Sequence, residues 1–292
     1  MTVVTRFAPS PTGYLHLGHA HAALFAYEQA KKAGGRFLLR IEDIDQARAR
    51  PEYEAAIYED LKWLGLEWQQ PVRRQFEHMG DYRNAVTYLE ALRLVYPCFC
   101  TRKEIQAEIA ESAEAPHRPP TEPLFGPDVQ PPYPGTCRAL SVAERQRRAK
   151  EGQPFALRLD MAWAVSQATM VAGPLTWTDR AKGTVIARPE IFGDVVIARK
   201  DTPASYHLAV TWDDHYQGVT LVTRGEDLFQ ATHVHRLLQA VLRLETPEYH
   251  HHPLLTDAAG RRLAKRDRGL TIRSLREAGK TADEVRKMAG FP

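Results

Sequence analysis

The sequence predicts an α/β fold with parallel central strands, and three stretches support this. Residues 2–7 are apolar and largely β-branched, and they lead through a proline-rich turn into a helical pattern that runs from residue 18 to the glycine pair 34–35. Residues 36–43 and 219–223 are two further apolar runs that end abruptly in charged residues. This pattern is typical of strands that are buried on both faces and that end at a ligand-binding edge.

Length and composition exclude several classes of protein. The 292 residues are 43% apolar and 26% charged, as in globular proteins. No apolar run approaches the roughly 18 residues of a membrane span, and the N-terminus lacks the pattern of an export signal. Three cysteines are an odd number, which argues against a disulfide framework and favours a reducing compartment. We therefore expect a cytoplasmic protein that binds no membrane.

The turn after the first strand has the features of a nucleotide site. Pro9 and Pro11 prevent helix formation there, and a helix begins a few residues later. The first amides of a helix attract phosphates. His16 and His19 are three residues apart, so both can face one anion, and Gly18 lets a ligand approach the backbone. The alternative is a proline-rich turn with two surface histidines.

Charged groups follow the second strand and also gather near the C-terminus. Glu42, Asp43 and Asp45 come where the strand of residues 36–43 ends, so they predict a polar group at the ligand edge. Between residues 260 and 280, eight Lys or Arg residues stand against two acidic ones. Such a run favours contact with ATP phosphates or an RNA backbone. In both cases the alternative is a solvated surface.

The rest of the chain is expected to form core elements and connections. The expected elements are helices at 51–64, 82–95, 102–113, 229–244 and 281–288, a proline-rich loop at 116–134, and strands within 153–201. His233, His235 and the histidines at 250–252 have no carboxylate or cysteine partners at ligand spacing, so we expect them on a helix surface and in a loop. We expect Asp213 and Asp214 to stabilise a turn or a helix start.

Three cysteines flank the proline-rich loop and suggest a structural metal. Cys98 and Cys100 lie on one tight turn and Cys137 lies across the loop, which suits a zinc knuckle. The fourth ligand stays open between His117 and Tyr133. Histidine is the commoner zinc ligand, whereas a phenol ionises only near pH ~10. The alternative is three cysteines without a metal.

Two motifs resemble the signatures of class I aminoacyl-tRNA synthetases of the glutamyl/glutaminyl group. The first is Ala8-Pro9-Ser10-Pro11-Thr12-Gly13 followed by His16-Leu17-Gly18-His19. The second is Arg262-Leu263-Ala264-Lys265-Arg266, where the glutamyl pattern is Lys-[Leu/Ile]-Ser-Lys-Arg. Arg262 and Ala264 depart from that pattern, and Lys265 keeps it. Trp212 also departs, because the family usually has a small apolar residue there.

This resemblance implies a Rossmann-like catalytic domain with an inserted α+β acceptor-type domain that carries a zinc-knuckle-like loop. The implied boundaries are 1–97 and 191–244 for the two catalytic halves, 98–190 for the insertion, and 245–292 for the basic signature loop and a helical end. A full-length glutamyl-tRNA synthetase would continue into an anticodon-reading helical domain. We expect this chain to lack that domain.

The resemblance also implies the site residues. Those implied for glutamate are Arg6, Ala8, Ser10, Glu42, Tyr206 and Arg224. Those implied for ATP are His16, Gly18, His19 and Lys265, of which both histidines and the lysine are expected to be catalytic. Those implied for zinc are Cys98, Cys100, Tyr133 and Cys137. Arg224 would hold a carboxylate with two donors; the alternative is an ion pair with Glu226 or Asp227.

The architecture resembles the stand-alone members of this group. Their resemblance implies ATP- and Mg²⁺-dependent activation of glutamate and its transfer to the queuosine base of tRNA(Asp). We expect the chain to act as a monomer. Two alternatives stay open: a truncated glutamyl-tRNA synthetase that charges a tRNA 3′ end, and a non-catalytic tRNA-binding paralogue.

Overall fold

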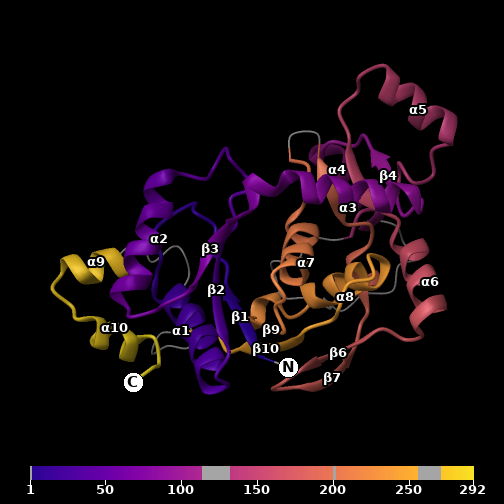
Figure 1. The fold of residues 1–292 in the computed structure, drawn as a ribbon. Helices are drawn as coiled ribbons and strands as arrows, with labels where there is room; N and C mark the ends of the chain where they lie inside the picture. Colours follow the sequence, from indigo (N-terminus) through magenta and orange to yellow (C-terminus); the bar gives the residue numbers. More distant parts are fainter. Residues whose placement is uncertain (1, 114–131, 200–201, 256–270) are drawn as a thin grey trace.

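The computed structural model describes residues 2–113, 132–199, 202–255 and 271–292, and Figure 1 shows their arrangement. The helices are α1 (Leu17–Lys32), α2 (Pro51–Trp63), α3 (Met79–Ala91), α4 (Arg102–Ala113), α5 (Val142–Lys150), α6 (Met161–Ala172), α7 (Tyr206–Tyr216), α8 (Ala231–Val241), α9 (Ile272–Glu277) and α10 (Ala282–Met288). The strands are β1 (Val4–Phe7), β2 (Arg36–Ile41), β3 (Gln69–Arg74), β4 (Val95–Cys98), β5 (Ala156–Leu159), β6 (Thr176–Asp179), β7 (Gly183–Ile186), β8 (Val196–Arg199), β9 (Leu221–Gly225) and β10 (Glu248–His252). Short 3₁₀ turns are η1 (Gln75–His78), η2 (Pro189–Phe192) and η3 (Glu226–Leu228).

Parallel strands form the centre of the molecule. β2 pairs in parallel with β1 and β3, and β9 pairs in parallel with β10. β1 and β9 lie side by side, where the Thr220 amide donates to the Val4 carbonyl at 3.0 Å (Figure 1). All residues of β1 and β9 are buried, including Arg6 and Arg224. The predicted α/β fold with parallel central strands is confirmed.

Antiparallel strands lie within residues 95–199. β4, β5 and β8 form a three-stranded antiparallel sheet, and β6 and β7 form a hairpin. β6 also pairs with β10, so the hairpin extends the parallel strands. The strands expected within residues 153–201 are present as β5, β6, β7 and β8, and α6 lies between β5 and β6. The Asp160 side chain caps that helix by accepting from the Trp163 amide at 3.1 Å.

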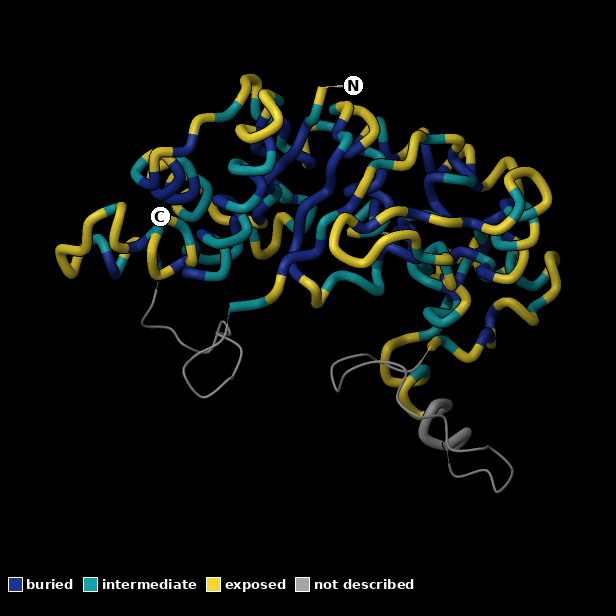
Figure 2. Tube along the Cα trace, turned by 90° about the horizontal axis from the view of Figure 1, so that it is seen from below, coloured by how far each residue is buried: buried dark blue, intermediate teal, exposed yellow. Residues whose placement is uncertain are grey.

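Most of the helices pack around two apolar cores, and Val222 of β9 and Tyr249 of β10 belong to a third core together with Val4 and Leu38. α1 and α2 pack with β1, β2, α9 and α10 around one core. α3, α6, α7 and α8 pack around the other. Figure 2 shows the buried strands running through the middle of the molecule, with exposed residues towards its rim. In the described part of the chain, no helix is both long enough and apolar enough to cross a membrane.

Several expectations about single elements were wrong. His233 and His235 are buried in α8, and His251 and His252 are buried in β10, so none of these four lies on a surface or in a loop. The helix predicted at 82–95 is α3, which begins earlier than predicted and ends at residue 91. It ends there because residues 95–98 form β4 and pair with β5. β3 was missed because its sequence is polar. The helix predicted at 281–288 is confirmed as α10, and Thr281 and Glu284 form a capping box at its start.

Candidate active site

The first turn of α1 fixes two histidine rings beside each other. His16 caps the helix, since its Nδ1 accepts from the Gly18 amide at 3.1 Å. His19 Nδ1 accepts from the His16 amide at 3.2 Å, and the ring centroids are 3.9 Å apart. A neutral imidazole that accepts at Nδ1 carries its proton at Nε2. Each ring therefore offers a donor on the side away from the cap.

Gly18 is required by the histidine that precedes it. A Cβ atom on Gly18 would lie 2.9 Å from Cε1 of His16, which is too close. The glycine thus serves the capping ring, in addition to leaving the backbone open as the sequence suggested.

The C-terminal segment returns to this turn. Thr271 forms a β-bridge with His16, and the Ile272 amide donates to the Leu15 carbonyl at 2.8 Å. The predicted signature residues Arg262, Ala264 and Lys265 lie outside the described residues, as does His117. Residue 271, six positions after the signature lysine, nevertheless contacts the first signature directly.

A cavity of about 640 Å³ lies beyond the end of β2. Its lining includes Ser10, Glu42 and Tyr206, which come from three distant parts of the sequence. The structure therefore brings together three of the residues that the resemblance implied for glutamate. Ala8 follows β1 directly and is half-buried.

Burial gives one residue of this cavity an unusual proton affinity. The side chain of Glu42 is 11% exposed, and its Oε1 lies 3.4 Å from Nη2 of Arg40. Burial raises the pKa of Glu42 to about 7, although Arg40 and Arg6 act in the opposite direction. The Glu42 carboxyl thus titrates near neutral pH.

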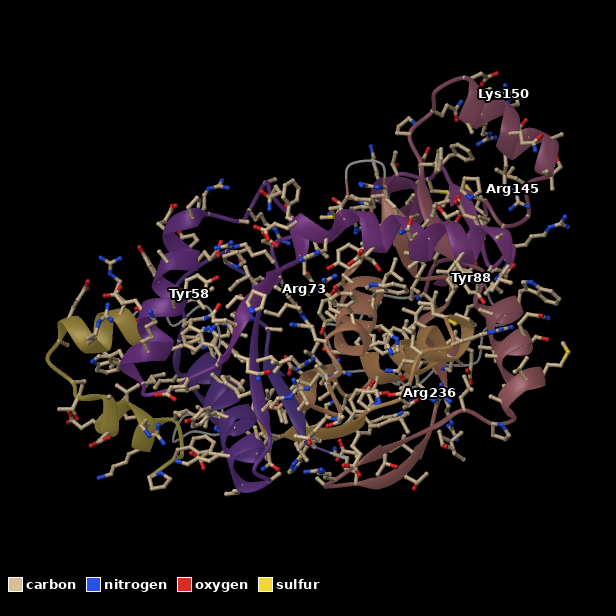
Figure 3. The ribbon with its side chains drawn as sticks, in the orientation of Figure 1. Tyr58, Arg73, Tyr88, Arg145, Lys150 and Arg236 are labelled. Carbon is tan, nitrogen blue, oxygen red and sulfur yellow. The ribbon has the colours of Figure 1, made fainter. Side chains whose placement is uncertain are left out.

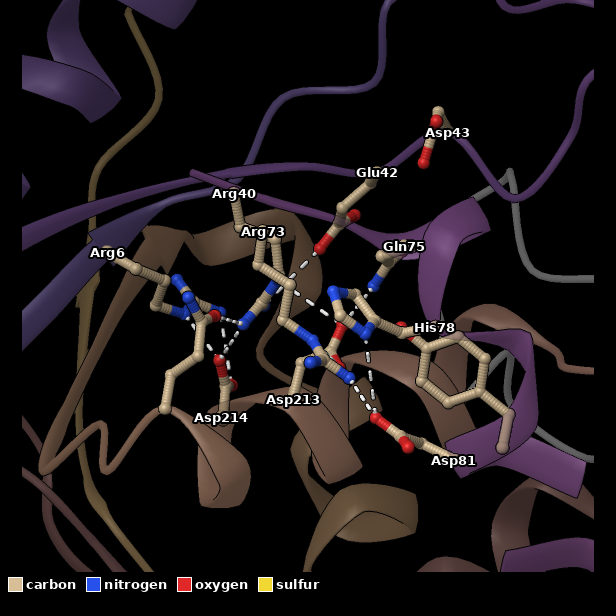
Figure 4. A network of polar contacts seen from close by, with 12 residues as sticks. Arg6, Arg40, Glu42, Asp43, Arg73, Gln75, His78, Asp81, Asp213 and Asp214 are labelled. Atoms are coloured by element: carbon tan, nitrogen blue, oxygen red, sulfur yellow. Dashed lines mark hydrogen bonds and ion pairs between the residues drawn. The ribbon is translucent and has the colours of Figure 1, made fainter. Parts of the chain in front are cut away.

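Three buried arginines next to this cavity are paired with two aspartates of α7 (Figure 4). Arg6 Nε lies 2.8 Å from Asp214 Oδ1, and Arg40 Nη1 lies 2.9 Å from the same oxygen. Arg73 Nε lies 2.8 Å from Asp213 Oδ1. The expectation that the two aspartates stabilise a turn or helix start was wrong, because they lie in the second half of α7 and are buried.

Further groups contribute to this network, although Nε of Arg40 has no hydrogen-bond partner among the described residues and lies 3.8 Å from Asp213 Oδ2. Asp213 Oδ2 accepts from the Gln75 amide and from the Tyr82 hydroxyl, both at 2.8 Å. Arg73 Nη2 lies 2.6 Å from Asp81 Oδ2, and Figure 3 shows Arg73 at the junction between β3 and α7. The network therefore joins β1, β2 and β3 to α7 next to the cavity.

Arg224 on β9 is buried in a different way. Its guanidinium donates from Nε to Nε2 of His251 at 3.1 Å, from Nη1 to Nδ1 of His235 at 3.1 Å, and from Nη2 to the Thr232 hydroxyl. It forms no ion pair within the described part of the chain, whereas Glu226 pairs with Lys182. Among the described residues, Arg224 therefore does not form the alternative ion pair with Glu226 or Asp227.

Sequence reasoning missed the partners that hold these arginines. The signal was present for Arg40, which stands inside the apolar run Phe37-Leu38-Leu39-Arg40-Ile41 of a buried strand. A charge at such a position requires a buried partner. Nothing local identified which residue, because Asp213 and Asp214 are more than 170 positions away.

The three cysteines cluster as predicted. The Sγ atoms of Cys98, Cys100 and Cys137 lie within 4.8 Å of one another. The Tyr133 hydroxyl is 3.4 Å from Sγ of Cys100 and accepts from the Cys137 amide at 2.8 Å. Three clustered sulfurs fit three of the four positions of a tetrahedral zinc site.

Comparisons with known proteins identify the family of this chain. Residues 2–288 match the family described as tRNA synthetases class I (E and Q), catalytic domain. The chain is 47% identical over 291 residues to a Rhodobacter capsulatus protein named glutamyl-Q tRNA(Asp) synthetase, covering 99% of this chain and 100% of that one.

Longer relatives match as well. A glutamate–tRNA ligase of Aquifex aeolicus is 38% identical over 95% of this chain and 54% of its own length. A crystal structure of the glutamate–tRNA synthetase of Elizabethkingia anophelis superposes with a TM-score of 0.75 at 29% identity, over 91% of this chain and 53% of that one. This chain spans about half the length of these two proteins. The chain belongs to the glutamate and glutamine group of the class I tRNA synthetase family.

Proposed function

We propose that this protein activates glutamate with ATP and transfers it to the queuosine base of tRNA(Asp). The observation that carries the first step is the buried Arg224, whose charge meets no carboxylate among the described residues. Transfer to queuosine is supported by the relatives named glutamyl-Q tRNA(Asp) synthetase, which match at 39–47% identity over most of the chain.

Glutamate binds in the cavity beside β2. Arg224 is the carboxylate partner, because a planar guanidinium matches a carboxylate and its buried charge needs a counterion. Glu42 in its ionised form holds the ammonium group, and Tyr206, Ser10 and Ala8 complete the site. Arg6 contributes less charge than the resemblance implied, because Asp214 already pairs with its guanidinium.

The ATP triphosphate binds at the first turn of α1. His16, His19 and Lys265 contact its phosphates, and Gly18 leaves room for them beside the backbone. The contact between Thr271 and His16 supports this, since it brings the segment after the second signature to the first. Mg²⁺, when bound, neutralises phosphate charge.

Two transfers then complete the reaction. A glutamate carboxylate oxygen forms a bond to the α-phosphorus, and the bond from that phosphorus to the bridging oxygen breaks, so pyrophosphate leaves. A hydroxyl of the queuosine ring attacks the resulting mixed anhydride at its carbonyl carbon, loses its proton, and releases AMP. The protein positions the reactants and stabilises the charge that builds up on phosphate.

Residues 98–190 are proposed as an inserted acceptor-type domain between catalytic halves 1–97 and 191–244, with residues 245–292 carrying the second signature. Cys98, Cys100, Cys137 and Tyr133 would hold zinc in this insertion. Burial raises the pKa of the metal-free Cys100 thiol to about 12, so zinc binding must displace its proton.

Two assays test the proposed function. The first is glutamate-dependent exchange of pyrophosphate into ATP in the absence of tRNA, and we expect exchange. No exchange at saturating glutamate would favour the non-catalytic alternative, which is motivated by the departures at Arg262 and Ala264.

The second assay follows labelled glutamate onto tRNA. We expect labelling of tRNA(Asp) that contains queuosine and no labelling of the same tRNA carrying guanine instead, which is the matched control. Labelling of tRNA(Glu) at its 3′ end would favour the other candidate, a truncated glutamyl-tRNA synthetase, for which the 38% identity to the Aquifex ligase is the motivating observation.

A further inference from the structure

A continuous row of polar side chains connects the cavity wall to a buried aspartate on β6. In order, the row contains His207, His235, Arg224, His251 and Asp179. The joining distances are 3.1 Å from His207 Nδ1 to His235 Nε2, 3.1 Å from His235 Nδ1 to Arg224 Nη1, 3.1 Å from Arg224 Nε to His251 Nε2, and 2.6 Å from His251 Nδ1 to Asp179 Oδ2.

Arg224 sets the direction of every hydrogen bond in this row. A guanidinium has five N–H donors and no acceptor. His235 must therefore accept at Nδ1, and a neutral imidazole that accepts at one nitrogen donates from the other. His235 thus donates from Nε2 to Nδ1 of His207. By the same rule His207 carries its own proton at Nε2.

The other side of Arg224 follows the same rule. His251 accepts from Arg224 at Nε2, so its proton is on Nδ1 and is donated to Asp179. Asp179 also accepts from the amides of Ala181 and His251, at 2.9 and 3.1 Å. The Asp179 carboxylate is thereby held in place, and it supports the Nδ1–H tautomer of His251.

All three rings are neutral at physiological pH. Burial and the Arg224 charge lower the pKa of His207 to about 4 and keep that of His235 well below its ordinary range. The pKa of His251 is also lowered to about 4 by burial and Arg224, even though Asp179 acts in the opposite direction. Further charges that act on His235 come from Arg6.

The free end of the row faces the cavity. His207 lines it together with Glu42 and Tyr206. The Nε2 atom of His207 has no hydrogen-bond partner among the described residues. It is also not fully buried. This N–H is therefore accessible from the cavity.

We propose that His207 contacts the amino-acid substrate by donating from Nε2 to a carboxylate oxygen, and that His235 fixes this polarity and so favours a carboxylate over a carboxamide. A carboxylate has only acceptors and suits a cavity into which His207 donates. The amide of glutamine ends in an NH₂ group, which needs an acceptor that a locked His207 does not provide. This inference rests on the proposed glutamate activation.

The tautomers are tested directly by long-range ¹⁵N–¹H NMR of the imidazoles in the whole protein. We expect the Nε2–H tautomer for His207 and His235 and the Nδ1–H tautomer for His251. An Nδ1–H tautomer at His207 would overturn the proposed polarity. This result does not depend on enzymatic activity.

The role of the polarity is tested with paired substitutions of His235. In His235→Gln, the amide oxygen accepts from Arg224 and the NH₂ group donates to His207, so the polarity is kept. His235→Leu breaks the row and releases His207 to take either tautomer. We expect His235→Leu to raise KM for glutamate about tenfold and to strengthen inhibition by glutamine, with kcat changed less than about threefold.

His235→Gln should restore both values to within about threefold of the wild type. Equal behaviour of the Leu and Gln variants would show a packing role and overturn the inference. His207→Phe should raise KM for glutamate about 10–30-fold, as expected for a lost hydrogen bond to a charged group; an unchanged KM there would overturn the contact.

The wild-type exchange assay separates the two claims. Absence of glutamate-dependent exchange in the wild type overturns the proposed function and the substrate contact with it. Normal wild-type exchange with unaffected His207 and His235 variants overturns this inference alone.

Discussion

Three buried arginines on β1, β2 and β3 differ from a fourth, Arg224 on the neighbouring strand β9, in the groups that surround their charge. On β1, β2 and β3, three arginines face carboxylates at 2.6–2.9 Å. On β9, Arg224 is almost as buried as Arg6, with 6% against 5% of its surface exposed, but its partners among the described residues are two imidazoles and a hydroxyl. Equal burial therefore does not imply equal function.

The difference separates structural charges from a binding charge. An arginine that is fully paired inside the protein has little left to offer a ligand. A buried arginine with neutral partners keeps most of its electrostatic attraction for an anion, because imidazole nitrogens and a hydroxyl oxygen supply dipoles but no compensating charge. The paired set holds the two halves of the molecule together, and Arg224 is poised for an anion.

The largest effect is expected from breaking the paired set. Arg40→Met leaves Asp213 and Asp214 with one fewer cation in a buried site, so the free energy of unfolding should fall by about 3–5 kcal/mol. Denaturant unfolding at neutral pH measures this. The matched control is Arg180→Met, which breaks a surface pair with Glu248 and should change stability by less than about 1 kcal/mol. Similar losses of unfolding free energy in the two variants would contradict the claim that the buried ion pairs stabilise the fold more than a surface ion pair does.

A smaller effect concerns Glu42, whose carboxylate lies 3.4 Å from Arg40 of the paired set. Its pKa of about 7 means that the ionised form needed for the ammonium group increases between about pH 6 and pH 8. We expect KM for glutamate to fall on the order of tenfold over this interval. Glu42→Gln should bind glutamate weakly at every pH. A wild-type KM independent of pH would contradict the assigned role.

The same pKa shift predicts a change in stability of known sign. A carboxyl whose folded pKa is raised from 4.5 to about 7 stabilises the fold below its unfolded pKa, and this contribution is lost as the pH rises through about 7. Glu42→Gln should therefore increase the free energy of unfolding at pH 8 by about 1–3 kcal/mol. The increase should shrink towards pH 4.5; a variant that is less stable than the wild type at pH 8 would contradict the shift.

The smallest effect on the glutamate site is expected from the cysteine cluster. Cys137→Ser should remove bound zinc, measured by atomic emission as metal per chain, because a neutral hydroxyl is a much poorer ligand than a thiolate. KM for glutamate in the exchange assay should stay within about threefold of the wild type. Zinc that survives in Cys137→Ser, or its absence from the wild-type protein, would rule out the proposed ligand set.

Local patterns predicted the parts of the fold that depend on local physics. The strand, turn and helix at the N-terminus follow from apolar periodicity, Pro9 and Pro11, and residues 36–43 were predicted as a buried strand from composition alone. β3 was missed because a strand whose sequence is Gln-Gln-Pro-Val-Arg-Arg owes its conformation to pairing with β2.

Long-range polar contacts were beyond the sequence. Motif resemblance nominated Glu42, Tyr206 and Arg224, but not the way each is held. Whether a histidine is buried depends on what packs against it, so His235 and His251 were wrongly expected outside the core. Only the folded chain brings Arg224 to both rings, and only that geometry fixes their tautomers.

Calorimetric binding of L-glutamate to Arg224→Met tests the central claim most directly, together with unfolding of the same variant. If the buried charge serves the ligand, glutamate affinity should fall at least about 100-fold, or ~2.7 kcal/mol. The free energy of unfolding should be unchanged or higher, because an unneutralised buried cation has been removed. Affinity within about threefold of the wild type, or a loss of stability as large as that of Arg40→Met, would contradict the account.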